Sequence, residues 1–367
     1  MNVIEQRLVE ATRYEPPQRK DWRIGCIGAG FIMADCHLVA YRNAGLQPAA
    51  IASRTPSHAE TVAQRHAIPN VYDTWRELLD DESIEILDIA YPPDQQLDIV
   101  REAVKRDHIK GILCQKPVAM TLEDAKEIAR LGDESNKKIA VNSNMRCDQS
   151  MRALKYLLDE GILGEPVLAT IEMRAIPHWQ PFLEEYDRLE IFSMGIHHVD
   201  IFRFLFGDPE EITCVCRPDP RTRFPHVDGI TQFTFKYPSD LLATSLDDVW
   251  AWPEEPCEKD IYIKWRVEGM DGMVKGTIGW PDYPMRAPST LQFTSKHYPH
   301  QWIAPVWDTV WFPDAFEGTM TSLLRAVEQD DEPEISARDN VRTIACVEGC
   351  YRSIEEKRTV RFDEFGF

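Results

Sequence analysis

The chain has 367 residues, of which 43% are hydrophobic and 28% are charged, and its formal net charge is −20. This length predicts two domains with sizeable cores, and the acidity disfavours binding to the phosphate backbone of nucleic acids. No run approaches the roughly 20 apolar residues that cross a bilayer. The nine cysteines form no Cys-x-x-Cys pair and the histidines lack zinc-site spacing, so we expect reduced thiols, a cytoplasmic location, no metal site and no membrane partner.

Residues 1–20 are predicted to be a polar arm, and residues 21–143 a first domain in which short apolar runs alternate with amphipathic stretches. The predicted strands are 23–28, 47–53, 85–90, 111–115 and 138–142, and the predicted helices are 30–43, 56–66, 95–106 and 122–135. Thr55 and Thr121 are the expected N-caps of the second and fourth of these helices. Such alternation predicts a parallel, doubly wound sheet with helices on both faces, as in a Rossmann domain.

Residues 144–367 change in character, because strands now follow one another with few helices between them. The predicted strands are 166–174, 212–217, 229–236, 241–249, 261–268 and 273–278, and the predicted helices are 149–159, 195–206, 314–329 and 336–356. Consecutive strands without crossover helices favour antiparallel pairing. The sequence therefore predicts an α+β second domain with a large, mostly antiparallel sheet.

A glycine-rich turn follows the first predicted strand. Gly28 and Gly30 supply the first two glycines of G-x-G-x-x-G, while the third position is Met33. Such a turn lets main-chain N–H groups approach a pyrophosphate at a helix N-terminus, so Gly28, Gly30, Phe31 and Ile32 are predicted to bind a dinucleotide.

The second predicted strand ends in Ser53 and Arg54, where dinucleotide-binding domains often carry an acid that binds the ribose 2′-hydroxyl. Arg54 can pair with a 2′-phosphate, which favours NADP. In the alternative interpretation Arg54 is a solvated loop charge, and NAD is bound through Ser53.

Four further motifs give the chain a resemblance to a known family. They are Tyr91-Pro92-Pro93, Cys114-Gln115-Lys116-Pro117, Asn144-Met145-Arg146 and the stretch Gly195–Asp200. Together they resemble the Gfo/Idh/MocA family of glucose–fructose oxidoreductases and inositol dehydrogenases. The resemblance implies a Rossmann domain followed by a domain with a large open sheet, substrates among sugars, glycosides and cyclic polyols, and homodimers or homotetramers built partly through that sheet.

The resemblance also implies site residues. Besides the turn, Ser53 and Arg54, the cofactor would contact Tyr91, Pro92, Gln96, Gln115 and Lys116. The substrate would contact Lys116, Arg146, His178, Trp179, Ser193, His197 and His198. Two positions depart from the family pattern, since Gln115 stands where the family has Glu and Ser193 where it has Asp, while the lysine and the histidine are retained.

Oxidising an alcohol requires a base for the hydroxyl proton. A lysine can serve if its pKa falls from about 10.4 to roughly 7–8, and burial and a cationic nicotinamide both act in that direction. Lys116 follows a predicted parallel strand, at the edge where ligands bind. We therefore predict Lys116 as general acid/base, with His197 bonded to the same substrate oxygen.

The leading interpretation is an NAD(P)-dependent sugar, glycoside or polyol dehydrogenase. A first alternative keeps the nicotinamide bound and uses transient oxidation for elimination or for a hydride shuttle between two sugars. A second alternative is a non-catalytic sugar or nucleotide sensor, to which the substitutions at Gln115 and Ser193 give some weight.

Overall fold

The computed structural model describes residues 3–175, 181–249, 260–279 and 287–367. The contacts divide the chain into two units. The dinucleotide-binding unit comprises residues 14–144 and 312–344, and the sheet unit comprises residues up to 13, 145–311 and 345–367. Residues 312–344 thus belong to the same unit as residues 14–144. The helix α10 (Ala337–Glu356) begins in the dinucleotide-binding unit and ends in the sheet unit.

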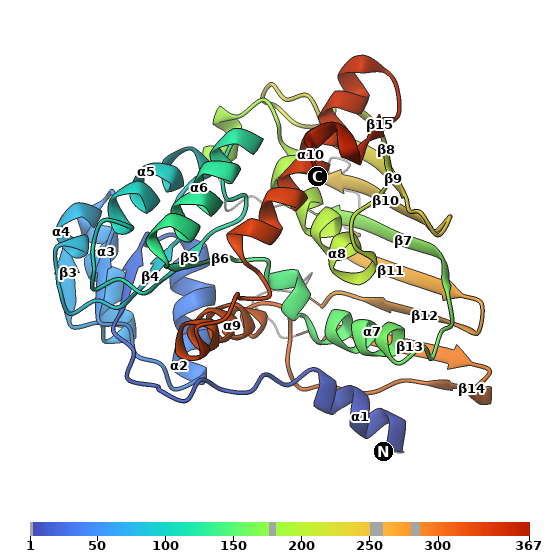
Figure 1. Ribbon diagram of the computed structural model, residues 1–367, viewed down its shortest axis with the longest axis horizontal. Helices are drawn as coiled ribbons and strands as arrows, with labels where there is room; N and C mark the ends of the chain where they lie inside the picture. Colours follow the sequence, from blue (N-terminus) through green and yellow to red (C-terminus); the bar gives the residue numbers. More distant parts are fainter. Residues whose placement is uncertain (1–2, 176–180, 250–259, 280–286) are drawn as a thin grey trace. The chain divides into compact units, whose positions relative to one another are not determined.

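The dinucleotide-binding unit is built on a six-stranded parallel sheet (Figure 1). The strands are β1 (Ile24–Ile27), β2 (Ala50–Ala52), β3 (Asn70–Tyr72), β4 (Ile86–Ile89), β5 (Gly111–Cys114) and β6 (Lys138–Val141). Their order is β3-β2-β1-β4-β5-β6, and every pair is parallel. β1, β2, β4 and β5 are buried throughout, which explains their continuous apolar runs. The predicted doubly wound sheet is confirmed.

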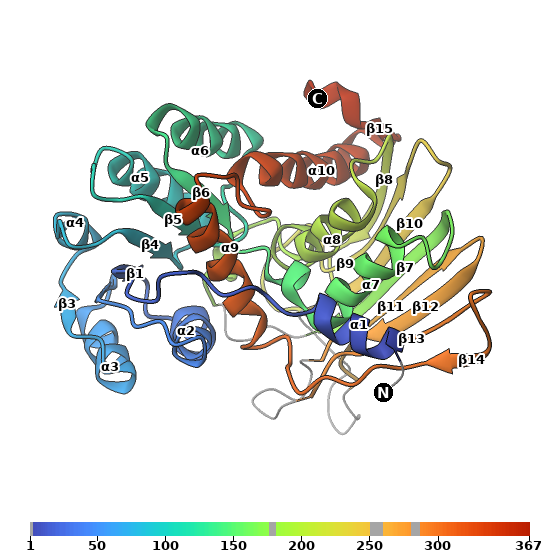
Figure 2. The same cartoon turned by 60° about the horizontal axis from the view of Figure 1, so that its bottom comes forward.

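Helices cover both faces of this sheet (Figure 2). They are the π-helix η1 (Ile32–His37), α2 (Leu38–Asn43), α3 (Pro56–His66), α4 (Trp75–Leu79), α5 (Pro93–Ala103), α6 (Leu122–Ser135) and α9 (Ala315–Gln329). α5 packs against α6, whereas α2 packs against α9. Phe316, Met320 and Leu323 of α9 are fully buried in the core beside η1, α2 and β1. A helix from the far end of the sequence therefore completes the apolar face of the dinucleotide-binding unit.

The two predicted N-caps differ in the structure. Thr121 Oγ1 accepts a hydrogen bond of 3.1 Å from the main-chain N–H of Asp124, which satisfies one donor at the start of α6. Thr55 occupies the N-cap of α3 but its side chain makes no capping bond, and Pro56 begins that helix. Both threonines thus occupy their predicted N-cap positions, and only Thr121 makes a side-chain capping bond.

The sheet unit holds nine strands. They are β7 (Pro166–Ala175), β8 (Glu211–Arg217), β9 (Ile230–Lys236), β10 (Leu242–Val249), β11 (Tyr262–Gly269), β12 (Gly272–Thr277), β13 (Thr290–Ser295), β14 (Tyr298–Ile303) and β15 (Val360–Arg361). The order is β14-β13-β12-β11-β7-β10-β9-β8-β15. Among the described strands, all neighbours are antiparallel except β7 and β10. This confirms the predicted mostly antiparallel sheet, and it adds β13, β14 and β15, which the sequence analysis did not predict.

The helical segments of the sheet unit are α1 (Val3–Ala11), η2 (Asn144–Cys147, shared with the other unit), α7 (Gln149–Asp159), η3 (Pro181–Glu185), η4 (Ile191–Gly195), α8 (Ile196–Phe206) and η5 (Phe362–Phe365). Figures 1 and 2 show α7 and α8 on the same face of the sheet. α1 lies within the predicted polar arm and buries Ile4 and Leu8. Among the described residues, no helix is both long and apolar enough to span a membrane.

The two glycines of the first turn differ in their surroundings. Gly28 has a φ of +116°, and a Cβ there would lie 2.5 Å from the carbonyl oxygen of Ala90. Gly30 is exposed, and no heavy atom lies within 4 Å of the position that a Cβ would take. Gly28 is therefore required by the backbone and the close approach of β4, whereas folding does not require a glycine at position 30.

This contrast predicts opposite effects of the same substitution. Gly28→Ala should lower the free energy of unfolding by about 1–3 kcal/mol through backbone strain, with the collision at Ala90 adding to the loss. Gly30→Ala should leave it unchanged or raise it by about 0.4–1 kcal/mol, since alanine restricts the unfolded chain. Thermal and urea unfolding of the cofactor-free protein measure both effects, and equal destabilisation by the two variants would contradict this account.

Candidate functional site

The strand order of the dinucleotide-binding unit reverses between β1 and β4, and ligands of open parallel sheets bind at such a reversal. The glycine turn lies there, because the Gly28 N–H donates to the carbonyl oxygen of Ala52 at 2.8 Å and the Gly28 Cα approaches Ala90. Open space surrounds Gly30. Main chain at the start of η1 can therefore face a pyrophosphate without obstruction from a side chain at position 30, so the turn fits a dinucleotide.

The other predicted cofactor residues of this unit gather at the carboxyl ends of neighbouring strands. Ser53 and Arg54 follow β2, and Tyr91 and Pro92 follow β4, with Pro92 at the N-cap of α5. Burial raises the pKa of the Tyr91 phenol, and a bond from the Arg54 main chain partly offsets that rise. Tyr91 thus adjoins the end of β2. Arg54 is exposed, and its guanidinium makes no ion pair within the described part of the chain.

Lys116 follows β5, two strands from the glycine turn, at the same carboxyl edge of the sheet. Its residue is partly exposed, yet burial of the ammonium group lowers its pKa from 10.5 to about 7. The cause is desolvation, which favours the neutral amine. A lysine with this pKa can accept or release a proton near neutral pH.

Two glutamine side chains fix the main chain on both sides of Lys116. Gln96 of α5 donates from Nε2 to the carbonyl oxygens of Gln115 (2.9 Å) and Pro117 (2.8 Å), and its Oε1 accepts from the Gln115 N–H at 2.7 Å. The Gln115 Oε1 accepts from the Lys116 N–H at 2.9 Å. Both side chains are buried. Gln96 and Gln115 were predicted to contact the cofactor, and the structure shows them bonded to the Lys116 loop.

A buried polar cluster lies under this loop, and the sequence analysis did not identify it. It consists of His37 on η1, Tyr41 on α2, Asp88 on β4 and Asn142 after β6, all at most 1% exposed, and it reaches Gln115. One signal was present in the sequence, because Asp88 is an acid inside an otherwise apolar strand, and a buried charge needs a polar partner.

The second motif lies in the sheet unit on η4 and the first turns of α8. Ser193 and His197 are 2% and 4% exposed, and the His197 ring meets Trp311 edge to face with centroids 5.4 Å apart. Asp228 holds the start of this segment, since its carboxylate accepts from the N–H groups of Leu189 and Ile191, each at 2.8 Å. Burial raises the pKa of Asp228, while those bonds oppose the rise.

Two other predicted substrate residues already have strong partners within the sheet unit. Arg146 makes a bidentate ion pair with Asp200, with bonds of 2.7 and 2.6 Å between buried side chains. The His198 Nδ1 lies 2.9 Å from Ser245 Oγ and 3.0 Å from Asp247 Oδ1, and the residue is fully buried. These bonds tie α8 to η2 and to β10. His178 and Trp179 lie outside the described residues.

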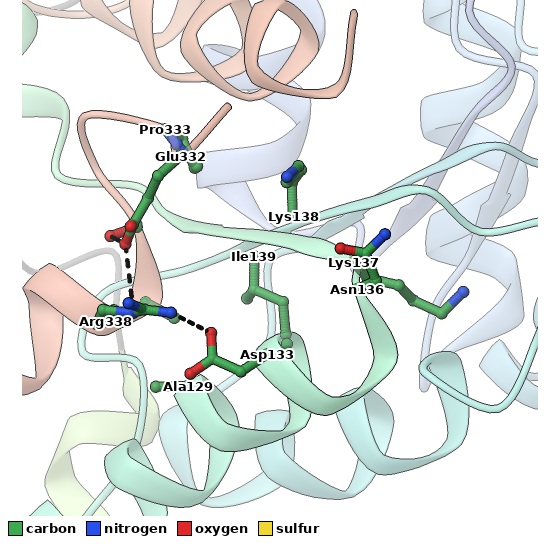
Figure 3. Close-up of a pocket in the computed structure, with 12 residues that line it drawn as sticks. Ala129, Asp133, Asn136, Lys137, Lys138, Ile139, Glu332, Pro333 and Arg338 are labelled. Carbon is green, nitrogen blue, oxygen red and sulfur yellow. Dashed lines mark hydrogen bonds and ion pairs between the residues drawn. The ribbon is translucent and has the colours of Figure 1, made fainter. Parts of the chain in front are cut away.

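A surface pocket of the dinucleotide-binding unit lies at the opposite, amino edge of its sheet, beside the start of β6 (Figure 3). Its most prominent cation, Arg338, is paired with Asp133 at 2.7 Å and Glu332 at 3.6 Å. Lys137 donates to two carbonyl oxygens, and Lys138 pairs with Asp330. These charges are satisfied within the protein, and the pocket contains none of the residues predicted for the site.

Comparison with known proteins agrees with this geometry. Residues 22–143 match the family described as "Oxidoreductase family, NAD-binding Rossmann fold", and residues 151–275 match the Gfo/Idh/MocA C-terminal domain. A D-apiose dehydrogenase from Paraburkholderia graminis is 25% identical over 93% of this chain and 90% of its own length. An inositol 2-dehydrogenase from Rhizobium meliloti is 23% identical over 92% of this chain and 98% of its own length.

Solved structures share the fold across both units. An oxidoreductase from Agrobacterium radiobacter, in complex with NAD+, L-tartaric acid and magnesium, is 23% identical, with a TM-score of 0.81 over 94% of this chain and 99% of that one. Levoglucosan dehydrogenase in complex with NADH and L-sorbose gives a TM-score of 0.80 at 18% identity, over 94% of this chain and 99% of that one. The two matched domains, taken with the glycine turn and the Lys116 loop, show that this chain belongs to the Gfo/Idh/MocA family of NAD-binding oxidoreductases.

Proposed function

We propose that this chain is a dehydrogenase that interconverts a ring hydroxyl and a carbonyl on a sugar, glycoside or cyclic polyol. The observation that carries the proposal is the Lys116 ammonium, whose pKa is lowered to about 7 by burial at the sheet edge that bears the glycine turn. The curated relatives support the substrate class, since they are named for apiose and inositol.

In the oxidation direction, the neutral Lys116 amine takes the hydroxyl proton while the carbon that bears the hydroxyl loses hydride. A nicotinamide, when bound at this edge, would supply the hydride acceptor, or the hydride donor in the reverse direction. Lys116 ends the oxidation as an ammonium and must release its proton to solvent, which a pKa near 7 permits. His197, held edge to face against Trp311, is the proposed second residue acting on the substrate oxygen. Because Arg146 and His198 have partners in the sheet unit, we assign them to supporting that histidine's helix.

Lys116→Met should lower kcat at least about 100-fold, because it removes the general base, while the cofactor dissociation constant stays within about threefold. The wild-type kcat/KM for oxidation should rise with pH through about 7, since the amine must be neutral, and for reduction it should fall over the same range. Lys105→Met is the matched control, because it removes an exposed charge just beyond the C-terminal end of α5. This variant should keep full activity. Near-normal turnover by Lys116→Met would exclude the role.

For the cofactor we propose a preference for NADP over NAD. It is supported by the exposed Arg54 after β2, which makes no ion pair within the described residues and is free to bind a 2′-phosphate. Arg54→Ser should weaken NADP binding by about 10- to 100-fold, the worth of a charge-assisted bond, and change NAD binding little. Arg42→Ser on α2 is the control and should leave the binding of both cofactors unchanged. Isothermal titration would contradict the proposal if the wild type bound NAD more tightly than NADP.

We further propose a homodimer or homotetramer built through the outer face of the nine-stranded sheet. One row of side chains on that face runs across Val215, Gln232, Leu246, Glu172 and Lys264, as the strand registers show. Val215 on β8 and Leu246 on β10 are 61% and 45% exposed, and both strands are paired on each side, so these apolar side chains are left open on the face of the sheet.

Leu246→Glu should shift the mass measured by light scattering towards that of a monomer, because it places a charge in the proposed interface. Met270→Glu, at an exposed turn between β11 and β12, is the control and should leave the mass unchanged. A monomeric wild type at micromolar concentration would exclude the assembly.

We also propose a cytoplasmic location, because the eight described cysteines are free thiols. Cell fractionation tests this location.

A further inference from the structure

In the hydrogen bonds below the Lys116 loop, one main-chain group, the Lys116 N–H, determines which atoms donate and which accept. The Lys116 N–H can only donate, so the Gln115 atom 2.9 Å from it is the amide oxygen. The Asn142 atom 3.3 Å from that oxygen must donate, so it is the amide nitrogen Nδ2. Both amide orientations therefore follow from the position of one peptide N–H.

The same reasoning reaches the histidine. Asn142 Nδ2 also lies 2.9 Å from His37 Nε2, and Gln115 Nε2 faces the same ring nitrogen at 3.5 Å. Two amide donors converge on this nitrogen, so it must accept and carries no proton. The imidazole proton is then on Nδ1, which lies 2.7 Å from Asp88 Oδ2 and donates to it.

The charged group that contacts the His37 ring is the Asp88 carboxylate. Asp88 contacts the ring from β4, and the Tyr41 hydroxyl of α2 donates to the same carboxylate at 2.6 Å. From α9, the Phe316 ring lies 5.0 Å from the imidazole. Burial raises the pKa of the Tyr41 phenol and of the thiols of Cys26 on β1 and Cys114 on β5, so these groups remain neutral.

We propose that Gln115 is a positioning residue for Lys116, and that its neutral amide keeps the buried His37 unprotonated. The proposal rests on the role given to Lys116 in the proposed function and adds to it the reason for an amide at position 115. Gln115 fixes the Lys116 main chain with its oxygen and presents its nitrogen to the imidazole.

A carboxylate at position 115 would change both relations. Its second oxygen would occupy the place of Gln115 Nε2, which lies 3.5 Å from His37 Nε2 and faces that nitrogen's lone pair. Two acceptors at this distance repel unless the ring takes a proton. The added negative charge would also favour the ammonium form of the adjoining Lys116. The amide thus matches a neutral histidine and an easily deprotonated lysine, whereas the acid would match a charged histidine and a more basic lysine.

The test compares Gln115→Glu, which keeps the acceptor for the Lys116 N–H, with Gln115→Met, which loses it. If the carboxylate raises the pKa of Lys116 by about one unit, the neutral fraction at pH 7 falls from about half to about a tenth. The oxidation rate of Gln115→Glu should then fall about fivefold at pH 7 and recover to within about twofold at pH 10. Gln115→Met should lose at least about tenfold in kcat at every pH, because the lysine is no longer oriented.

Gln64→Glu, on the exposed face of α3, adds the same charge elsewhere in the unit and should leave the pH profile unchanged. Identical profiles for Gln115→Glu and Gln64→Glu would overturn the proposal, as would full activity of a folded Gln115→Met protein.

A second readout does not depend on turnover. In 15N-histidine-labelled wild type, the His37 imidazole, assigned by the loss of its signal in His37→Gln, should show the neutral Nδ1–H tautomer at pH 7. Gln115→Glu but not Gln64→Glu should convert it to imidazolium at the same pH. The pH dependence of Lys116 acetylation by acetic anhydride, followed by mass spectrometry, should shift upward in Gln115→Glu. If no sugar or polyol is turned over, the proposed function fails while these two measurements still decide the present proposal. An imidazolium or an Nε2–H tautomer at His37 in the wild type overturns it.

Discussion

The chemistry proposed for this protein depends on one constraint, the burial of a lysine amine at the end of a parallel strand. A buried ammonium is costly, so the neutral form gains and the pKa falls to about 7. That environment persists only if the loop carrying Lys116 cannot relax towards solvent. Gln96 and Gln115 prevent this, because their amides satisfy the peptide groups on both sides of the lysine after β5 has ended.

The glycine turn and the Lys116 loop are parts of one sheet edge, which is the basis of the cooperation proposed for them. β1 and β5 both pair with β4, so the spacing between the turn and the lysine is set by main-chain ladders rather than by flexible side chains. The polar cluster of His37, Asp88 and Asn142 joins η1, β4 and β6 beneath the same edge. The proposed cofactor contacts and the proposed acid/base chemistry therefore share a single buried framework.

The two departures from the family pattern, Gln115 and Ser193, have different structural explanations. Gln115 has a well-defined network in which an amide fits better than a carboxylate, because its nitrogen faces an unprotonated imidazole. Ser193 lies on the π-helix η4, buried at 2% exposure, in a segment whose N–H groups are bonded by Asp228. The segment is held in place by an acid from another loop, so its positioning does not require an acid at position 193.

The sequence alone determined the parallel strands and most of the helices, because burial of one face or of whole strands leaves a periodic pattern in the residues of each element. It also determined the family, through motifs that are local in the chain. It did not reveal that α9 completes the core of the first unit, that a helix forms within residues 3–11, or that Thr55 makes no cap bond. It also did not reveal the cluster of His37, Asp88, Gln115 and Asn142, whose members stand 27 to 105 positions apart. A local pattern records how one element is buried, whereas the partner of a buried polar group is decided by which elements the tertiary fold brings together.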